Sequence, residues 1–223
     1  MMNIDLVDLG ISDYKEAYQF QRETLRRRQF QEIKDTIILT EHNPVLTIGR
    51  SGSRSNILVG QDVLEAYKIS VYEIDRGGDI TYHGPGQIVV YPILDLKGYK
   101  KDIRWYIRSL EVVIINFLDK CNIKAERKDN LTGVWVEQEK IASIGIGVSK
   151  WVSYHGFSLN ICPDLEYFDL INSCGLVGTK ATSLSKILNK PVNIQDIKDI
   201  LMGSFEEIFG VKIETRQHLA RMA

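Results

Sequence analysis

The chain has 223 residues, 44% hydrophobic and 26% charged, a globular composition that excludes a disordered or collagen-like chain. Its 28 basic and 29 acidic residues give a net charge of -1, which excludes the strongly basic footprint of a non-specific nucleic-acid binder. Cys121, Cys162 and Cys174 form no CxxC pair, and their odd number favours a reducing compartment. No apolar run approaches the ~20 residues of a membrane helix, and acidic residues stand where a signal peptide has basic ones. We therefore expect a cytoplasmic protein.

The first half of the chain is predicted to contain several strands and one long helix. The helix is expected to begin at a cap on Ser12 and to end at about Lys34. Its run Arg26–Arg28 is expected to be a solvated face, with a docking patch for an acidic partner as the alternative. A glycine-rich loop is expected between the last two strands. Alternating and β-branched runs predict strands at residues 4–9, 36–40, 45–48, 71–74 and 88–93.

The second half also mixes helices and strands. Its clearest helix, residues 102–120, has apolar residues at the 3–4 spacing of one buried face. Strands are expected at 133–136, 141–148 and 153–161, a short helix at 165–171, and a last helix at 193–209 before Gly210. These elements predict an α+β fold with a mixed β-sheet flanked by helices. We expect a single domain over residues 1–223, with a smaller C-terminal appendage.

The stretch from Arg76 to Gln87, RGGDITYHGPGQ, is the first candidate for chemistry. Its glycines let the backbone approach a ligand closely and expose N–H groups. Arg76 is suited to pair with a phosphate or carboxylate, and His83 to donate a hydrogen bond or a proton. A long turn with a structural histidine is the alternative, because turns also collect Gly and Pro. His42 and His218 show no partner in the sequence and are assigned no role.

Three further features are candidates. Gly145 and Gly147 precede no helix, which excludes a dinucleotide-binding fingerprint, and we expect these glycines to let a ligand chain lie against a strand. Cys174 follows a short predicted helix and precedes a glycine, where free N–H groups are suited to hold an oxyanion; a small buried residue is the alternative. Lys140 opens an apolar strand, where a desolvated amine is able to take a proton from a thiol; an ordinary surface lysine is the alternative.

Several blocks of the sequence resemble one family. They are DRGGDITYHGPGQIVVYPILDL at 75–96, LTGVWV at 131–136, KIASIGIGVSKWVSYHGFSLNI at 140–161 and DLEYFDLINSCGLVGTKATSL at 164–184. They are similar to the octanoyltransferases of lipoate synthesis, also called lipoyl(octanoyl) transferases or lipoate-protein ligase B. The similarity spans about residues 40–185. Two positions depart from the family pattern: Ser173, where proline is common, and Gly147, where a large or basic residue is common.

The resemblance implies the fold of the biotin/lipoate ligase catalytic domain and a cysteine/lysine dyad acyltransferase without cofactor or metal. Cys174 matches the acyl-accepting nucleophile, and Lys140 matches the lysine that lowers its pKa. The implied donor is octanoyl-acyl carrier protein. The implied acceptors are lysines on lipoyl domains of 2-oxoacid dehydrogenases and on the glycine cleavage H protein. The implied substrate-binding residues are Arg76, Gly77, Gly78, Asp79, Ile80, Thr81, Tyr82, His83, Ser143, Ile144, Gly145, Gly156, Phe157 and Ser158.

Two other functions are compatible with this sequence. An ATP-dependent lipoate or biotin ligase would share the fold, although such ligases carry an arginine-arginine, triple-glycine loop and lack the cysteine block. A non-catalytic module that senses acyl chains or lipoylated proteins would need neither the amine of Lys140 nor the thiol of Cys174. Because acyl carrier proteins are acidic, charge alone predicts basic contacts for them at Arg26–Arg28, Arg50, Arg54 and Arg104.

Overall fold

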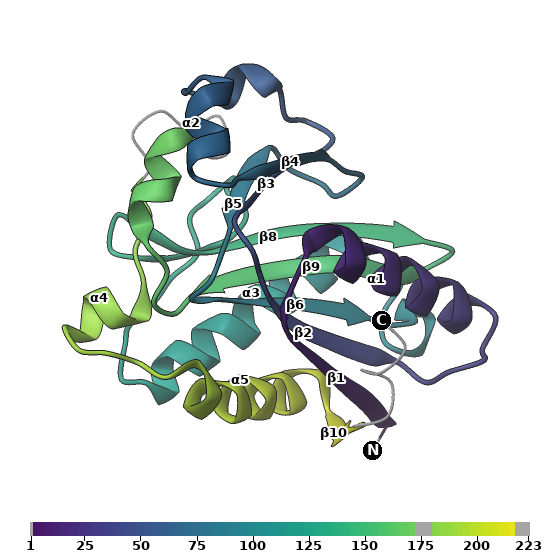
Figure 1. Ribbon diagram of the computed structural model, residues 1–223. Helices are drawn as coiled ribbons and strands as arrows, with labels where there is room; N and C mark the ends of the chain where they lie inside the picture. The colour runs from purple at the N-terminus through teal and green to yellow at the C-terminus, as the bar shows by residue number, and fades with distance from the viewer. Residues whose placement is uncertain (1, 173–179, 217–223) are drawn as a thin grey trace.

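The computed structural model describes residues 2–172 and 180–216, which form two sheets and the helices around them. Figure 1 shows the smaller sheet above the larger one. The smaller sheet has the order β4 (Ser70–Glu73), β3 (Val45–Ile48), β5 (Ile80–His83). The larger sheet has the order β10 (Val211–Thr215), β1 (Met2–Ser12), β2 (Thr36–His42), β6 (Gln87–Ile93), β9 (Val152–Asn160), β8 (Glu139–Ser149), β7 (Val134–Val136).

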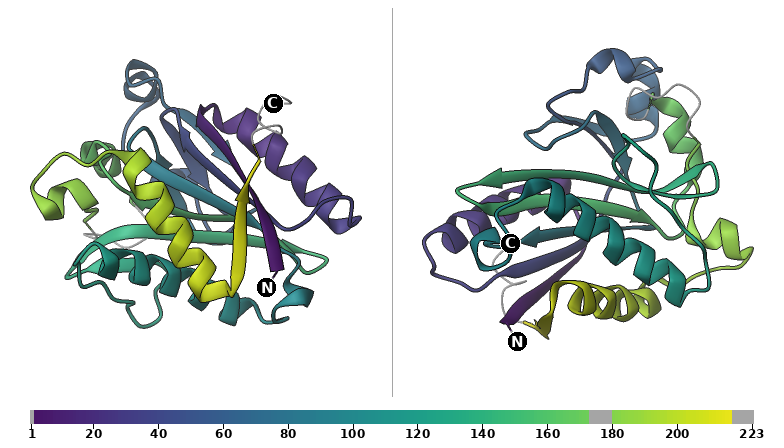
Figure 2. Two further views of the ribbon diagram at one scale, coloured as in Figure 1. Left: turned by 90° about the horizontal axis from the view of Figure 1, so that it is seen from below. Right: turned by 180° about the vertical axis from the view of Figure 1, so that it is seen from behind.

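The larger sheet is mixed and is covered by helices on both faces. Strand β1 runs parallel to β10 and β2, whereas the remaining neighbours are antiparallel. Helices α3 (Ile103–Lys120) and α5 (Ile194–Phe209) lie side by side on one face (Figure 2), and α1 (Tyr14–Gln29) covers the other (Figure 1). The short helices α2 (Gln61–Ala66) and α4 (Leu184–Leu188) lie at the periphery. The predicted fold class, a mixed sheet flanked by helices, is confirmed.

Hydrophobic burial explains how the helices dock. The apolar stripe of α3, including Tyr106, Leu110 and Ile114, is fully buried against the sheet. The Asp102 carboxylate caps this helix by accepting the N–H of Trp105 at 3.0 Å. A second apolar cluster lies under α1 and includes Leu25 and Tyr91. The sheet is therefore buried on both faces, which agrees with its long runs of β-branched residues.

Five sequence expectations about the elements differ from the structure. Ser12 does not cap α1, because it is the last residue of β1 and the N-cap position is Asp13. Helix α1 ends at Gln29 instead of Lys34, because Gln31 takes a left-handed conformation at φ +60° and turns the chain away. The expected loop 76–87 contains strand β5, which pairs with β3. Residues 165–170 form a 3-10 helix. The C-terminal part is not an appendage, because β10 extends the main sheet and Phe205 of α5 is fully buried in the main core.

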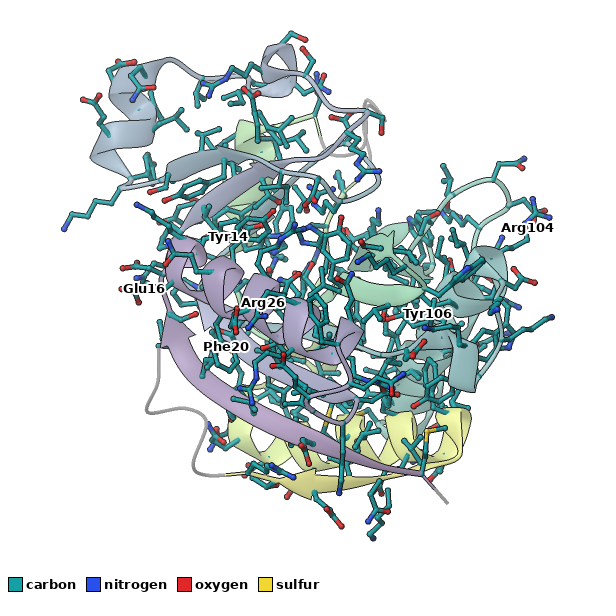
Figure 3. All side chains as sticks on the ribbon, turned by 90° about the vertical axis from the view of Figure 1, so that its right-hand side faces the viewer. Tyr14, Glu16, Phe20, Arg26, Arg104 and Tyr106 are labelled. Atoms are coloured by element: carbon teal, nitrogen blue, oxygen red, sulfur yellow. The ribbon has the colours of Figure 1, made fainter. Side chains whose placement is uncertain are left out.

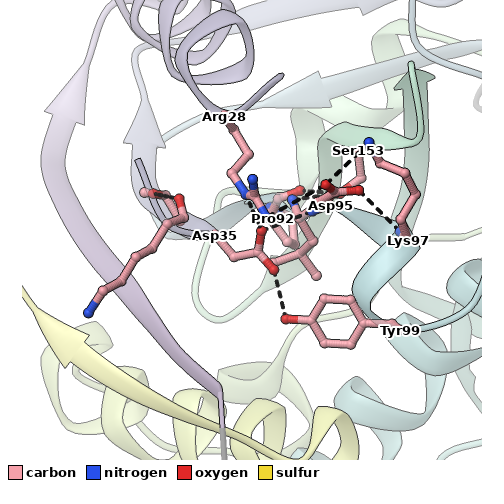
Figure 4. Close-up of polar contacts among 10 residues, drawn as sticks. Arg28, Asp35, Pro92, Asp95, Lys97, Tyr99 and Ser153 are labelled. Carbon is pink, nitrogen blue, oxygen red and sulfur yellow. Dashed lines mark hydrogen bonds and ion pairs between the residues drawn. The ribbon is translucent and has the colours of Figure 1, made fainter. Parts of the chain in front are cut away.

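Arg28 is also placed differently from the expected solvated helix face. Its Nε donates to the Asp35 carboxylate at 2.6 Å, and its side chain is only 17% exposed (Figure 4). Asp35 accepts further hydrogen bonds from the Tyr99 hydroxyl at 2.9 Å and from the Asp95 N–H at 2.9 Å. Arg28 thus joins the end of α1 to the sheet, which makes it a structural ion pair and removes it from any docking patch.

Candidate active site

A cavity of about 500 Å³, counted out to its mouth, lies between the two sheets. Its roof is the segment Ile74–His83, which ends in β5, and its floor is made by β6, β8 and β9. Tyr14 closes one side from the end of α1 that lies nearest the small sheet (Figure 3). A concave, mostly apolar site with a few convergent polar groups is the usual form of a small-molecule site.

Most of the predicted site residues line this cavity. Two lie outside it. Tyr82 points to the far side of β5 and stacks on Tyr167 with the ring centroids 4.8 Å apart, because successive strand residues face opposite ways. Gly77 donates its N–H to the Ile146 carbonyl at 2.8 Å. The predicted residues along the cavity are Arg76, Gly78, Asp79, Ile80, Thr81, His83, Lys140, Ser143, Ile144, Gly145, Gly156, Phe157 and Ser158.

The glycines of β8 make room for protein atoms, which corrects the expectation that they make room for a ligand. A Cβ on Gly145 would lie 2.8 Å from the Gly77 carbonyl oxygen and 2.9 Å from Cδ of Arg76. A Cβ on Gly147 would overlap the ring of Tyr154. Glycine at 145 therefore allows the Arg76–Gly77 backbone to lie directly on the sheet, and the departure at Gly147 accommodates an aromatic neighbour.

Lys140 is buried beside the cavity, which excludes the ordinary surface lysine considered above. Its side chain is 7% exposed, and Nζ lies 5.2 Å from the centroid of the Trp135 ring, within cation–π range. Gly133, at φ +139°, is needed here, because a Cβ at this position would lie 2.7 Å from Cε of Lys140. The end of the Lys140 side chain is thus held between an aromatic face and a close backbone.

The predicted nucleophile, Cys174, lies outside the described residues, but the chain on either side of its segment is described. Before it, the Asn172 N–H donates to the Asn56 carbonyl at 2.8 Å. After it, the Lys140 N–H donates to Lys180 O at 2.8 Å, and Lys140 O accepts the Thr182 N–H at 3.0 Å. The segment 180–182 therefore runs parallel to the strand of Lys140.

The two described cysteines are poor candidates for a nucleophile. Burial raises the pKa of the Cys121 thiol. Burial, and then the nearby Glu41 carboxylate, raise the pKa of the Cys162 thiol. Because the thiolate is the reactive form, both residues are disfavoured for acyl transfer.

A polar cluster around Asp75 was missed by the sequence interpretation. The Asp75 carboxylate accepts a hydrogen bond from Nε2 of His155 at 2.9 Å. It also accepts from the hydroxyls of Tyr154 at 2.8 Å and Tyr18 at 3.1 Å. Arg22 forms an ion pair with it at 3.1 Å. The hydrogen bond from His155 chiefly holds the pKa of Asp75 well below its usual range. Burial lowers the pKa of His155, which therefore donates as a neutral ring. The cluster joins α1, β9 and the cavity roof.

His155 is itself a cavity residue in an unusual conformation. It lies at φ +54° within β9, and its N–H donates to Oε1 of Gln21 at 2.6 Å. A non-glycine residue at positive φ costs of order 1–3 kcal/mol and is found preferentially at functional sites. In the sequence, a role for His155 was indicated only by its position inside one of the family-like blocks.

The arginines predicted to bind an acidic partner do not form one patch. Arg54 pairs with Glu73 at 2.7 Å, and Arg26 makes two hydrogen bonds to Glu23. Arg26 on α1 and Arg104 on α3 lie well apart, on helices that cover opposite faces of the sheet (Figure 3). These arginines therefore offer no continuous surface for the acidic partner that was predicted from charge.

Two negative observations concern only the described part of the chain. Within residues 2–172 and 180–216, no three His, Cys, Asp or Glu side chains gather closely enough to hold a metal ion. Across the same residues, no helix combines the length and apolarity needed to cross a bilayer.

Known proteins that resemble this chain share both its fold and its sequence. An octanoyltransferase of Caldicellulosiruptor bescii is 43% identical over 211 residues, which cover 94% of this chain and 92% of the relative. The putative lipoate protein ligase Ta0514 of T. acidophilum, solved with bound lipoic acid, superposes with a TM-score of 0.75 at 14% identity, over 99% of this chain and 92% of that one.

More distant structures extend the comparison at the level of the fold. The biotin protein ligase of Aquifex aeolicus, in complex with biotin and ATP, superposes with a TM-score of 0.55 at 13% identity over 94% of this chain and 71% of that one. The model of the lipoyl protein ligase A/B catalytic domain matches residues 13–206. The chain therefore belongs to the octanoyltransferase family, within the lipoyl protein ligase A/B catalytic domains.

Proposed function

We propose that this protein is a cytoplasmic acyltransferase that moves an octanoyl group from octanoyl-acyl carrier protein, through a thioester on Cys174, to a lysine of lipoyl domains. The curated relatives named octanoyltransferase support the acyl group, and lipoic acid bound to the T. acidophilum protein supports a chain of similar length in this fold. The acceptors would be lipoyl domains of 2-oxoacid dehydrogenases and the glycine cleavage H protein.

The observation that carries the proposal is the setting of Lys140. A buried amine opens onto a cavity, and its backbone is hydrogen-bonded to residues 180 and 182, six and eight residues after Cys174. A binding module for acyl chains has no use for a desolvated amine at this place. Burying a lysine is costly, so its presence favours a chemical role.

The first half-reaction would form the acyl-enzyme. The Cys174 thiolate attacks the thioester carbonyl of the donor, and the carrier thiol leaves with a proton supplied from the lysine side. Lys140 favours the thiolate if it is charged, and takes the thiol proton if it is neutral. Exchange of one thioester for another is nearly thermoneutral, so this step needs no further activation.

The second half-reaction would release the product. The acceptor ε-amine attacks the acyl-enzyme carbonyl and forms an amide, the amine proton passes to Lys140, and the Cys174 sulfur is restored. Amide formation from a thioester is downhill. Two adjacent glycines of the cavity roof are candidate donors to the oxyanion, and Gly77 is excluded because its N–H is bonded to the Ile146 carbonyl. Gly78, at φ +88° on the cavity wall, is retained.

The acyl chain would bind against the apolar part of the cavity wall. Ile80, Val89, Ile144 and Phe157 are all buried around it. Each methylene of the substrate that leaves water contributes about 0.8 kcal/mol. Binding of the chain then supplies the affinity that positions the thioester carbonyl near the catalytic groups.

Mass spectrometry of the intact protein after incubation with octanoyl-acyl carrier protein tests the proposal. We expect one added octanoyl group without ATP, which is lost when a lipoyl domain is added. Cys174→Ser should prevent this adduct, whereas the matched Cys162→Ser and Cys121→Ser should retain it. Transfer that requires ATP and free octanoate would place the protein with the adenylating ligases instead.

A further inference from the structure

A chain of buried hydrogen bonds runs from the cavity roof to the strand of Lys140. It begins at Arg76, whose Nη2 donates to Thr47 Oγ1 at 3.1 Å, and Thr47 Oγ1 lies 3.3 Å from Nε2 of His83. Nδ1 of His83 lies 3.2 Å from Oε1 of Gln87. Gln87 donates to Oδ1 of Asn160 at 2.9 Å. All of these side chains are less than 9% exposed.

Backbone carbonyls fix the direction of both amides in this chain. Nε2 of Gln87 also donates to Tyr82 O at 3.1 Å, and Nδ2 of Asn160 donates to Thr182 O at 2.9 Å. A carbonyl oxygen only accepts, so turning either amide would place two acceptors against each other. Oε1 of Gln87 must therefore face His83 as an acceptor.

The donor-to-acceptor direction of these hydrogen bonds determines which ring nitrogen of His83 carries a proton. Its Nδ1 must carry the proton that Gln87 accepts. Thr47 Oγ1 accepts from Arg76, so its own proton is available to Nε2, which keeps its lone pair. A charged ring would add a second donor at Thr47 and a second cation beside Arg76. Burial lowers the pKa of His83 well below its ordinary value, and the neighbouring His42 and Arg76 lower it further.

We propose that Gln87 and Asn160 are positioning residues that fix His83 as the neutral Nδ1–H tautomer and join the cavity roof to the strand of Lys140. The joint is direct, because Thr182, whose carbonyl accepts from Asn160, donates its N–H to Lys140 O at 3.0 Å. His83 is then a fixed part of the cavity wall and not an acid or base. The expected effect of His83 on acyl transfer rests on the proposed function, whereas the assignment of its tautomer does not.

The tautomer is measured directly on the unchanged protein. Long-range ¹H–¹⁵N NMR of histidine-labelled protein distinguishes the two neutral tautomers from the charged ring, and a His83→Gln variant assigns the signals. We expect His83 to be Nδ1–H and neutral at pH 7, and to gain its second proton only below the pH at which an ordinary histidine does. An Nε2–H ring, or a His83 that titrates at or above that pH, overturns the proposal even if acyl transfer is confirmed.

Gln87→Glu tests the positioning role. A carboxylate has the same shape but cannot donate to Tyr82 O and Asn160, and it faces His83 Nδ1 as a charge. We expect His83 to become protonated near neutral pH, against the opposing charge of Arg76. The kcat for octanoyl transfer should fall roughly 10- to 100-fold, with KM for the donor little changed.

The pH profile separates positioning from a merely structural role. Gln87→Glu should gain an ionisation in kcat that the parent lacks, whereas a variant that is only less stable keeps the profile of the parent. The matched control is Gln61→Glu on the exposed surface of α2, which adds the same charge far from the hydrogen bonds of Gln87. An unchanged kcat and pH profile in Gln87→Glu would refute the positioning role.

Discussion

Acid should destabilise this protein at a pH set by His42, which the fold keeps neutral and fully buried. Its Nε2 lies 2.7 Å from the Tyr91 hydroxyl, and its Nδ1 lies 3.3 Å from the Ser12 carbonyl, which only accepts. The ring therefore donates to Ser12 and accepts from Tyr91. Burial lowers the pKa of His42 from 6.5 to about 4, because a charged ring would have to leave water.

The sign and size of the effect follow from proton linkage. Between pH 6.5 and 4 the unfolded chain binds a proton at His42 that the folded chain does not bind, so stability falls as pH falls through this window. The full shift corresponds to about 3 kcal/mol, and about 2 kcal/mol of it is lost between pH 7 and 4.5. His83 and His155 also have lowered pKa values and add to the loss.

Urea unfolding followed by tryptophan fluorescence at pH 7, 6, 5 and 4.5 measures this loss. His42→Gln keeps a polar side chain but removes the titrating group, and should lose about 2 kcal/mol less than the parent over that range. Tyr91→Phe is the matched control, because it removes the hydrogen bond to His42 and should lower stability at every pH with the slope retained. Equal pH slopes in the parent and in His42→Gln would refute the reasoning.

Four further substitutions, at three positions, have defined expected outcomes. Lys140→Ala should slow alkylation of Cys174 by iodoacetamide at neutral pH, and Lys140→Arg should restore alkylation in part but not amide formation, because guanidinium keeps its proton. Asp75→Asn should lower the free energy of unfolding by about 1–3 kcal/mol, measured in urea, because the carboxylate that accepts from His155 becomes a weaker acceptor. Gly203→Ala in α5 should stabilise by about 0.5–1 kcal/mol in the same assay, because nothing lies within 4 Å of the added methyl group.

The elements that could be predicted from sequence are those that bury a regular stripe or run. Helices α3 and α5 carry apolar residues at helical spacing, and β2, β6 and β8 are rich in β-branched residues, so local pattern and final burial agree. The end of α1 could not be predicted in this way. It depends on a left-handed Gln31, and no glycine or proline marks the position.

The candidate site likewise has residues that the sequence identifies and contacts that it does not. Residues such as Lys140 and Arg76 lie inside contiguous family-like blocks, so a sequence comparison brings them forward together. The long-range contacts around the cavity were not visible, because His155 and Asp75 are 80 residues apart in the chain, and His42 and Tyr91 are 49 apart. No local periodicity encodes such pairs, and His42, assigned no role from the sequence, has two partners in the fold.

These long-range contacts explain how a cavity between two sheets keeps its shape. The roof segment is tied to β9 at both ends, by Asp75 to His155 and Tyr154, and by His83 through Gln87 to Asn160. Each buried hydrogen bond costs about 1–3 kcal/mol when it is broken without replacement. Moving the roof away from the floor would break several at once, so the resting cavity should already have the width it has when an acyl chain is bound. A site preformed in this way spends little binding energy on rearrangement, and under the proposed function this leaves more for placing the thioester of the donor.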